Sequence, residues 1–285
     1  MIESRRITLC ADDFALDRAT SSAVLELVAE RRISAVSCLT ESPLWKDSGR
    51  QLRRHRNAVL TGLHFNLTES FGCRRASLGG TILASVTRRL DPEQTSRDLR
   101  QQIDRFTDVV GALPDFIDGH QHVHAFPTIA PVVRRVAADA SPHAPIPVRS
   151  VSDCFGETDT PLKRTVIRRL AALGDREASD LRSTALNTGF TGIYSLGKRA
   201  NFARFLDEWL AAAPDRALVM CHPSAALRGK TASGRAEEFR FLCSAACSGL
   251  FTGHEIRFLQ RDEIDGGTAS RPPAIAPVQS AAIGV

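Results

Sequence analysis

The chain repeats one arrangement along most of its length: a short apolar run, a polar residue at its end, and then a segment with helical periodicity. Short apolar runs bounded by polar and turn residues are typical of buried strands. Strands that alternate with helices are joined by crossover connections and run parallel to one another. The sequence therefore predicts an α/β fold with a parallel sheet. We place its strands at residues 7–10, 35–39, 59–63, 115–118, 146–150, 218–221 and 256–259.

The clearest helix follows residue 90. Asp91 is a good N-cap, Pro92 suits the first helical position, and Gln94 completes a capping-box pattern. Gly111 is placed to end the helix. Its apolar stripe consists of Leu99, Ile103, Phe106 and Val110. Further helices are predicted at residues 18–30, 42–54, 127–140, 161–173, 200–213 and 236–244, and residues 69–90 are predicted to be a loop.

Each predicted site residue follows a strand. These residues are Asp12, Asp13, His64, His120 and His222. In a (β/α) barrel the carboxyl ends of all strands meet on one face, where active sites are found. An open doubly wound sheet also collects strand ends, but the phosphate-binding pattern GxGxxG is absent after the first strand. Five separate strand ends therefore favour a distorted (β/α) barrel of the TIM type.

Three histidines alternate in residues 118–124, which read Asp-Gly-His-Gln-His-Val-His. If this stretch is extended, the imidazoles of His120, His122 and His124 point to one side. Such a cluster suits a metal or a proton-transfer site, and a polar loop with histidines by chance is the alternative. The adjacent carboxylates of Asp12 and Asp13 likewise indicate a bound cation, with a helix-capping cluster as the alternative.

Composition limits the classes of partner. The net charge of +5 is spread over separate arginine pairs. With one Tyr and two Trp, the chain has few aromatic side chains that could stack on nucleic-acid bases. Nucleic-acid binding is therefore not expected. Seven cysteines without a CxxC pair favour reduced thiols and a cytoplasmic protein. No apolar run has the length of a transmembrane segment, and the oligomeric state, including a homo-oligomer, is left open.

The length of 285 residues and the hydrophobic content of 43% are sufficient for one large core. We expect residues 1–265 to form a single barrel domain that carries the catalytic site. Residues 266–285 are rich in Ala, Pro, Gly and Ser and have no apolar periodicity. They are predicted to be a disordered C-terminal tail.

Four segments together resemble the signature blocks of the YdjC-like carbohydrate deacetylases. They are Ala-Asp-Asp-Phe at 11–14, Gly-Leu-His-Phe-Asn-Leu-Thr at 62–68, the histidine-rich stretch at 118–124, and Met-Cys-His-Pro at 220–223. This family includes chitooligosaccharide deacetylase and hopanoid-associated deacetylases. The resemblance implies a distorted (β/α) barrel related to the polysaccharide deacetylases. One departure is Ala15, where the family usually has glycine, so this position is expected to need an unusual backbone angle.

The resemblance also implies residue roles. Asp13, His64 and His120 match the ligands of one divalent metal ion, Asp12 matches the base and His222 the acid. Magnesium is commonly assigned in the family, whereas ligation by imidazole suits zinc at least as well. A structural histidine before Pro223 is the alternative for His222.

Further residues are expected around this centre. His122 and His124 are not needed as ligands, so they are expected to orient the ligands or to contact the hydroxyl groups of a sugar. Arg149 is expected either to contact the substrate or to hold other site residues in place without touching the substrate. The candidates for shaping the cleft are Trp45, Arg74, Arg75 and Tyr194.

These residues suit amide hydrolysis. A carboxylate and two imidazoles leave positions on a metal for a water molecule and the acetyl oxygen, a second carboxylate can take a proton, and an imidazole can give one to the amine. We expect a deacetylase that removes the N-acetyl group of an amino sugar, in an oligosaccharide or a glycolipid headgroup, through a metal-activated water. A phosphoesterase or amidohydrolase on a similar barrel is the alternative, although these enzymes usually place His-x-His at the first strand. A non-catalytic binding protein would not need all five strand-end residues.

Overall fold

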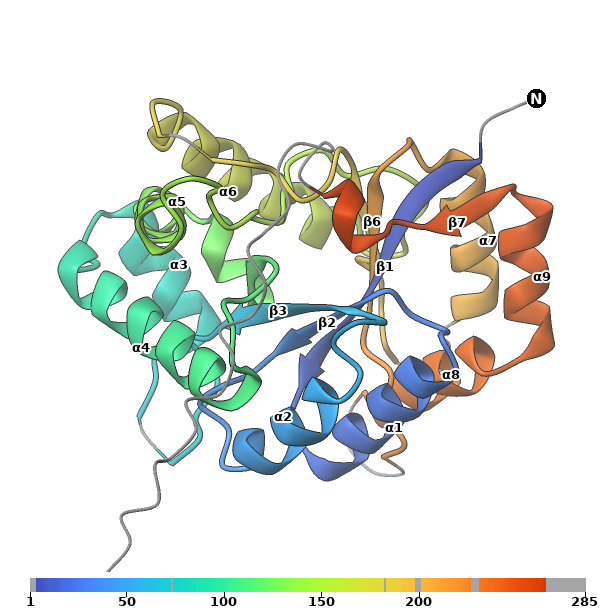
Figure 1. Cartoon of the computed structure of the whole chain (residues 1–285). Helices are drawn as coiled ribbons and strands as arrows, with labels where there is room; N and C mark the ends of the chain where they lie inside the picture. Colours follow the sequence, from blue (N-terminus) through green and yellow to red (C-terminus); the bar gives the residue numbers. More distant parts are fainter. Residues whose placement is uncertain (1–3, 73, 182, 198–200, 227–230, 265–285) are drawn as a thin grey trace, which may run out of the picture.

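A computed structural model of the chain describes residues 4–72, 74–181, 183–197, 201–226 and 231–264. Its centre is a curled sheet in which every strand pair is parallel, with the order β4-β3-β2-β1-β6-β5 and β7 paired to β1 (Figure 1). The strands are β1 (Arg5–Phe14), β2 (Ala35–Cys38), β3 (Leu60–Phe65), β4 (Ile117–Gly119), β5 (Phe190–Thr191), β6 (Ala217–Cys221) and β7 (Ile256–Phe258). The predicted parallel α/β fold is confirmed.

The long strand β1 organises the sheet. Its first residues pair with β7, its middle pairs with β6, and its end pairs with β2. The register with β2 shifts between Ala11 and Phe14, where Asp13 has a φ of 64°. A bulge of this kind bends a strand and changes the direction of a side chain. The irregularity lies at Asp12 and Asp13, where the chain carries its two adjacent carboxylates.

Short bridges continue the sheet beyond β4. Val148 pairs with Ile117 on one side and with Ala185 on the other, and Cys154 pairs with Phe190 of β5. The strands themselves therefore form a half-barrel, and irregular segments carry the backbone hydrogen bonds across the remaining gap. The expected distorted barrel is confirmed, but the predicted strand at 146–150 is reduced to an isolated bridge.

Helices cover the outer face of the curled sheet (Figure 1). They are α1 (Arg18–Ala29), α2 (Trp45–Arg53), α3 (Leu78–Val86), α4 (Pro92–Val110), α5 (Ile129–Ala140), α6 (Pro161–Glu177), α7 (Phe202–Ala212), α8 (Ala232–Leu242) and α9 (Ala245–Gly253), with 3-10 turns η1 (His120–Ala125) and η2 (Arg261–Glu263). In the part of the chain that the structure describes, no helix combines the length and apolarity needed to cross a membrane.

Several local predictions need correction. Asp91 caps α4 and Gly111 ends it in the left-handed conformation, as expected, but the capping box does not form because Gln94 donates to Asp98 instead. Residues 69–90 are not all loop: α3 forms there, with Ser77 accepting a hydrogen bond from the backbone of Gly80. The short strand β5 and the helix α9 were not predicted. The expected tail at 266–285 lies outside the described residues.

Gly62 in β3 packs directly against the ring of Phe116, and a Cβ atom at this position would lie 2.3 Å from that ring. We therefore expect Gly62→Ala to lower the free energy of unfolding by about 1–3 kcal/mol, the usual cost of overpacking a core. The matched control is Gly249→Ala in α9, where an added Cβ meets nothing within 4 Å. Alanine favours the helix there, so this control should leave stability equal or slightly higher. Chemical denaturation measures both values, and equal stability of the two variants would contradict the packing described.

Candidate active site

A pocket of about 470 Å³ lies at the carboxyl ends of the strands. Six predicted site residues line it: Asp12, Asp13, His64, His120, His122 and His222. They come from β1, β3, η1 and the residue after β6. His124 and Arg149 do not line the pocket and lie behind it. The parallel sheet thus brings together residues that are up to 210 positions apart in the chain.

The two aspartates point to different partners because the backbone between them is irregular. Asp13 and Ala15 both have positive φ values, 64° and 74°. The left-handed conformation is unfavourable for an L-residue with a side chain, by roughly 1–2 kcal/mol. Ala15 thus adopts the unusual backbone angle that was expected at the position where the family has glycine.

Asp13 lies among two imidazoles and a guanidinium. Its Oδ1 is 2.8 Å from Nδ1 of His120 and 3.4 Å from Nε2 of His64. Its Oδ2 accepts a hydrogen bond from Arg235 at 2.5 Å. Burial opposes the charge of the carboxylate, but His120, His64 and Arg235 hold the pKa of Asp13 well below its usual value. One atom each of Asp13, His64 and His120 lies within 4.8 Å of the others.

Asp118 orients His64 through the Nδ1 atom of the ring. Its Nδ1 lies 2.6 Å from Oδ1 of Asp118, and the hydroxyl of Ser37 contacts both groups. This contact leaves Nε2 facing Asp13, which is how metal-binding histidines are usually held. Burial disfavours the charged ring, yet Asp118 and Asp12 raise the pKa of His64 to about 10. The surrounding carboxylates therefore favour a positive charge at this position.

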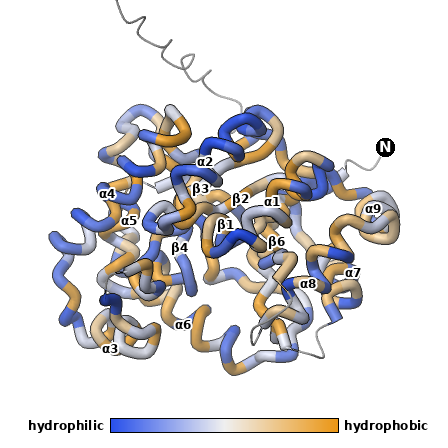
Figure 2. Tube along the Cα trace, turned by 90° about the horizontal axis from the view of Figure 1, so that it is seen from below, coloured by the Kyte–Doolittle hydropathy of each residue, from blue (hydrophilic) through white to orange (hydrophobic). Residues whose placement is uncertain are grey.

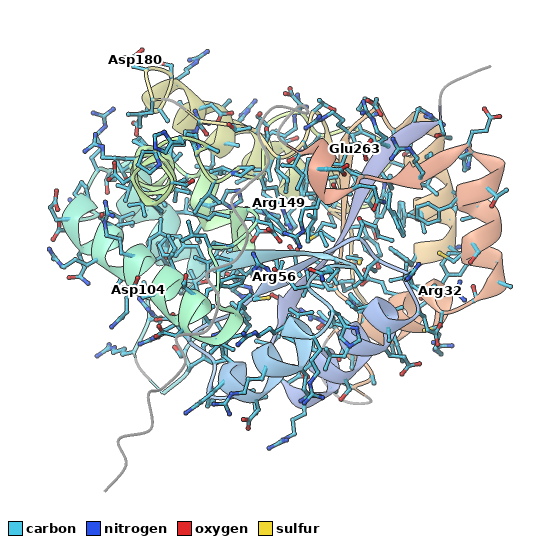
Figure 3. All side chains as sticks on the ribbon, in the orientation of Figure 1. Arg32, Arg56, Asp104, Arg149, Asp180 and Glu263 are labelled. Atoms are coloured by element: carbon cyan, nitrogen blue, oxygen red, sulfur yellow. The ribbon has the colours of Figure 1, made fainter. Side chains whose placement is uncertain are left out.

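Arg149 lies in the middle of the molecule (Figure 3). Its side chain is completely buried and pairs with two carboxylates. Its two terminal nitrogens donate to the two oxygens of Asp12, each at 2.7 Å, and Nη2 also forms an ion pair with Asp118. The guanidinium also contacts Sγ of Cys10 at 3.1 Å. Cys10, Asp12 and Asp118 by themselves have the composition of a metal site, but the guanidinium supplies the cation there. A fully buried Arg149 cannot touch a substrate.

The histidine-rich stretch is not extended, so the prediction that three imidazoles point to one side is wrong. After β4 the chain coils into η1, with Gln121 and His122 in the left-handed conformation at φ 55° and 63°. An added Cβ at Gly119 would lie 2.9 Å from the backbone nitrogen of His124, so the coil closes tightly on this glycine. His120 and His122 consequently reach the pocket, while His124 turns away from it.

His122 and His124 have different surroundings. His122 lines the pocket, packs edge-on against Phe190, and has no hydrogen-bond partner for Nδ1 among the described residues. Nε2 of His124 contacts the backbone oxygen of Arg149 at 3.0 Å. Burial lowers the pKa of both rings, that of His124 to about 4. His122 is thus open to a ligand, whereas His124 supports the segment that carries Arg149.

His222 lies on the wall of the pocket beyond the end of β6. Its backbone nitrogen donates to the buried carboxylate of Glu238, which also accepts a hydrogen bond from Tyr194 at 2.7 Å. Burial lowers the pKa of His222 to about 4, and Asp13 only partly opposes this effect. The nearby carboxylate of Asp13 therefore does not keep the imidazole of His222 protonated.

Two residues of the site carry no sequence signal. Arg235 and Glu238 lie one turn apart in α8, in a stretch without a recognisable motif, and contact Asp13 and the backbone of His222. Trp45, a candidate for shaping the cleft, is buried away from the pocket and donates to the backbone of Arg105. Tyr194 does line the pocket, although it is almost completely buried.

Comparison with known proteins agrees with this architecture. The model of the YdjC-like protein family matches residues 6–252. Chitooligosaccharide deacetylases from Salmonella typhimurium LT2 and Salmonella typhi are 29% identical over 231 residues, which cover 77% of this chain and 82% of each relative. A crystal structure from Enterococcus faecalis V583, of a candidate cellobiose-phosphate cleavage protein, shares the fold with a TM-score of 0.65. It is 17% identical, and the superposition covers 92% of this chain and all of that one. Because the family match spans most of its length, the chain belongs to the YdjC-like family.

Proposed function

We propose that this protein is a metal-dependent deacetylase that hydrolyses the N-acetyl group of an amino sugar. The observation that carries the proposal is that two adjacent aspartates have different contacts. Asp13 faces two imidazoles, whereas Asp12 is held by Arg149 in the same pocket. Metal-dependent amide hydrolysis uses a cation and a separate base side by side. The names of the two Salmonella relatives support an N-acetylated carbohydrate as the substrate.

The residues fit a divalent ion. One carboxylate and two imidazoles form a common donor set for such a metal, and the raised pKa of His64 indicates that the site favours positive charge. Asp13, His64 and His120 would hold the ion, and Asp118 would keep Nε2 of His64 directed at it. When bound, the ion would polarise the acetyl carbonyl and make a water molecule more acidic. This donor set suits Zn²⁺ at least as well as Mg²⁺.

Asp12 is proposed as the base. It lies at the pocket beside Asp13, and its two hydrogen bonds to Arg149 fix the plane of the carboxylate. A carboxylate held in a fixed direction at this place can accept a proton from water. Asp12 is also held apart from the imidazoles that surround Asp13, so it is available for proton transfer.

His222 is proposed as the group that returns a proton to the departing amine. It lines the same pocket, and the bond from its backbone to Glu238 fixes the end of β6. Since burial keeps the resting imidazole neutral, His222 must gain a proton within the reaction cycle before it can donate one. In the alternative role, His222 stays neutral and only donates a hydrogen bond to the acetyl oxygen.

The overall activity is tested with a set of N-acetylated amino sugars, measuring acetate release with and without added Zn²⁺ or Mg²⁺. We expect release from at least one sugar, loss of release with a chelator, and recovery with metal. Turnover of phosphate esters without any acetate release would replace the proposal with a phosphoesterase on the same site.

We expect loss of metal from ligand variants without loss of the fold. Asp13→Asn, His64→Ala and His120→Ala should each weaken Zn²⁺ binding by more than about 100-fold, because removing a ligand should cost more than removing a supporting group. His254→Ala is the control, since this histidine pairs with Asp207 outside the pocket. Competition with a chromophoric chelator measures affinity, and circular dichroism checks folding. Normal affinity in all three variants would remove the assignment.

Asp12→Asn should keep the metal and slow turnover by roughly 10²–10⁴-fold, the usual contribution of a positioned base. Cys10→Ser is the matched control because Cys10 also contacts Arg149 but is given no role in proton transfer. Initial rates of acetate release with saturating metal provide the measurement. Near-normal turnover in Asp12→Asn would show that the base lies elsewhere.

His222→Ala should slow hydrolysis of the amide far more than hydrolysis of an activated acetyl ester, because a good leaving group needs no proton. We expect the ratio of ester to amide rates to rise by roughly 10²-fold or more relative to the wild type. Equal slowing of both substrates at unchanged metal content would assign His222 to the acetyl oxygen instead.

A further inference from the structure

A buried carboxylate lies next to the proposed proton donor. Glu238 of α8 is 0% exposed, and its two oxygens accept hydrogen bonds from two different segments of the pocket wall. Oε1 accepts from the hydroxyl of Tyr194 at 2.7 Å, and Oε2 accepts from the backbone nitrogen of His222. Burial raises the pKa of Glu238 to about 7, and the two hydrogen bonds oppose this shift. Burying an acid costs more than burying a neutral side chain, and such acids cluster at functional sites.

The direction of the His222 ring depends on how its backbone is held. The ring lines the pocket, and its Nδ1 has no hydrogen-bond partner among the described residues. Proline disfavours helical backbone angles for the residue before it, so Pro223 restricts His222 to extended conformations. The backbone N–H of His222 is bound by Glu238. The carboxylate of Glu238 is therefore placed to set the position of the imidazole without touching it.

The segments that Glu238 joins are packed closely against one another. Helix α8 lies near the end of β6 in Figure 2, in agreement with the bond from Glu238 to the residue after that strand. Gly234 lies one turn before Glu238 in α8, and an added Cβ there would overlap the carbonyl oxygen of Leu196. Gly192 has a φ of 108°, and an added Cβ would overlap the carbonyl oxygen of Met220 in β6. Residues 192–196, the end of β6 and α8 consequently form one rigid wall of the pocket.

We propose that Glu238 is a positioning residue for His222, and that Tyr194 holds Glu238 in the orientation that this role needs. The inference rests on the proposed deacetylase function and adds two residues to its proton-donating step. A carboxylate offers an acceptor oxygen to the hydroxyl of Tyr194 and another to the N–H of His222 at once, whereas an amide has a single oxygen. This requirement accounts for an acid at a buried position where a neutral side chain would cost less.

The test measures acetate release from an N-acetyl sugar and from an activated acetyl ester at saturating metal. Glu238→Gln keeps the size of the side chain but leaves one acceptor oxygen for two donors. We expect it to slow amide hydrolysis by about tenfold or more, because displacing a catalytic group lowers the rate steeply. The ester should slow much less, so the ratio of ester to amide rates rises. Tyr194→Phe removes only a hydroxyl group and should raise the ratio by a smaller factor. Circular dichroism checks folding, and Tyr194→Phe provides the test if Glu238→Gln unfolds.

Glu237→Gln is the matched control, because Glu237 lies in the same helix and accepts a hydrogen bond from the backbone of Phe202 without lining the pocket. It should keep the wild-type ratio of ester to amide rates. In the His222→Ala background, Glu238→Gln should leave the ratio unchanged, because the group that it positions is absent.

Three results would overturn the inference while leaving the deacetylase function standing. The first is equal slowing of ester and amide in Glu238→Gln, which would indicate a purely structural role. The second is a ratio that Glu237→Gln raises as much as Glu238→Gln does. The third is an effect of Glu238→Gln on the ratio that is as large without the imidazole of His222 as with it. No acetate release by the wild-type protein from any N-acetylated sugar would overturn both proposals.

Discussion

The site depends on one buried guanidinium. Arg149 is 0% exposed in its side chain and pairs with Asp12 and Asp118, which are almost completely buried themselves. Burying any of these charges alone would be strongly unfavourable, and removing one partner from such a cluster costs about 3–5 kcal/mol in comparable cases. Burial opposes the charge of each group, but the opposite charges hold the pKa of Asp118 well below and that of Arg149 well above the usual values. Asp118 and Arg149 therefore stay ionised.

This cluster connects the proposed metal ligands with the proposed base. Asp118 binds Arg149 with one oxygen and His64 with the other, so the same carboxylate orients a proposed metal ligand and the residue that fixes the proposed base. Support comes from η1 and from β2: His124 contacts the backbone of Arg149, and Ser37 contacts Asp118. A planar guanidinium that reaches two carboxylates imposes a distance and an angle that a single point charge does not. The spacing between Asp12 and His64 is consequently set by rigid groups.

Sequence reasoning predicted that the candidate residues would lie together because it relied on a property of parallel sheets. Asp12, Asp13, His64, His120 and His222 each follow a strand, and strand ends meet on one face. It failed where geometry depends on contacts distant in the chain. Alternation in residues 118–124 suggested an extended segment, but Gly119 permits a tight coil, and only packing shows that His124 faces Arg149. Helix α3 was not predicted, because Gly79 and Gly80 lower the helix propensity of that segment. Arg235 and Glu238 occupy a helix without a motif, and Arg149 follows a stretch that pairs through isolated bridges.

The most direct test of this account is the behaviour of Arg149→Lys. Lysine keeps the positive charge but cannot reach both oxygens of Asp12 and the carboxylate of Asp118 at once. We expect the variant to fold, to bind Zn²⁺ about 10-fold more weakly because His64 is less well oriented, and to release acetate roughly 10²-fold more slowly at saturating metal. Wild-type affinity and turnover in Arg149→Lys would contradict the account, because charge alone would then be sufficient to organise the site.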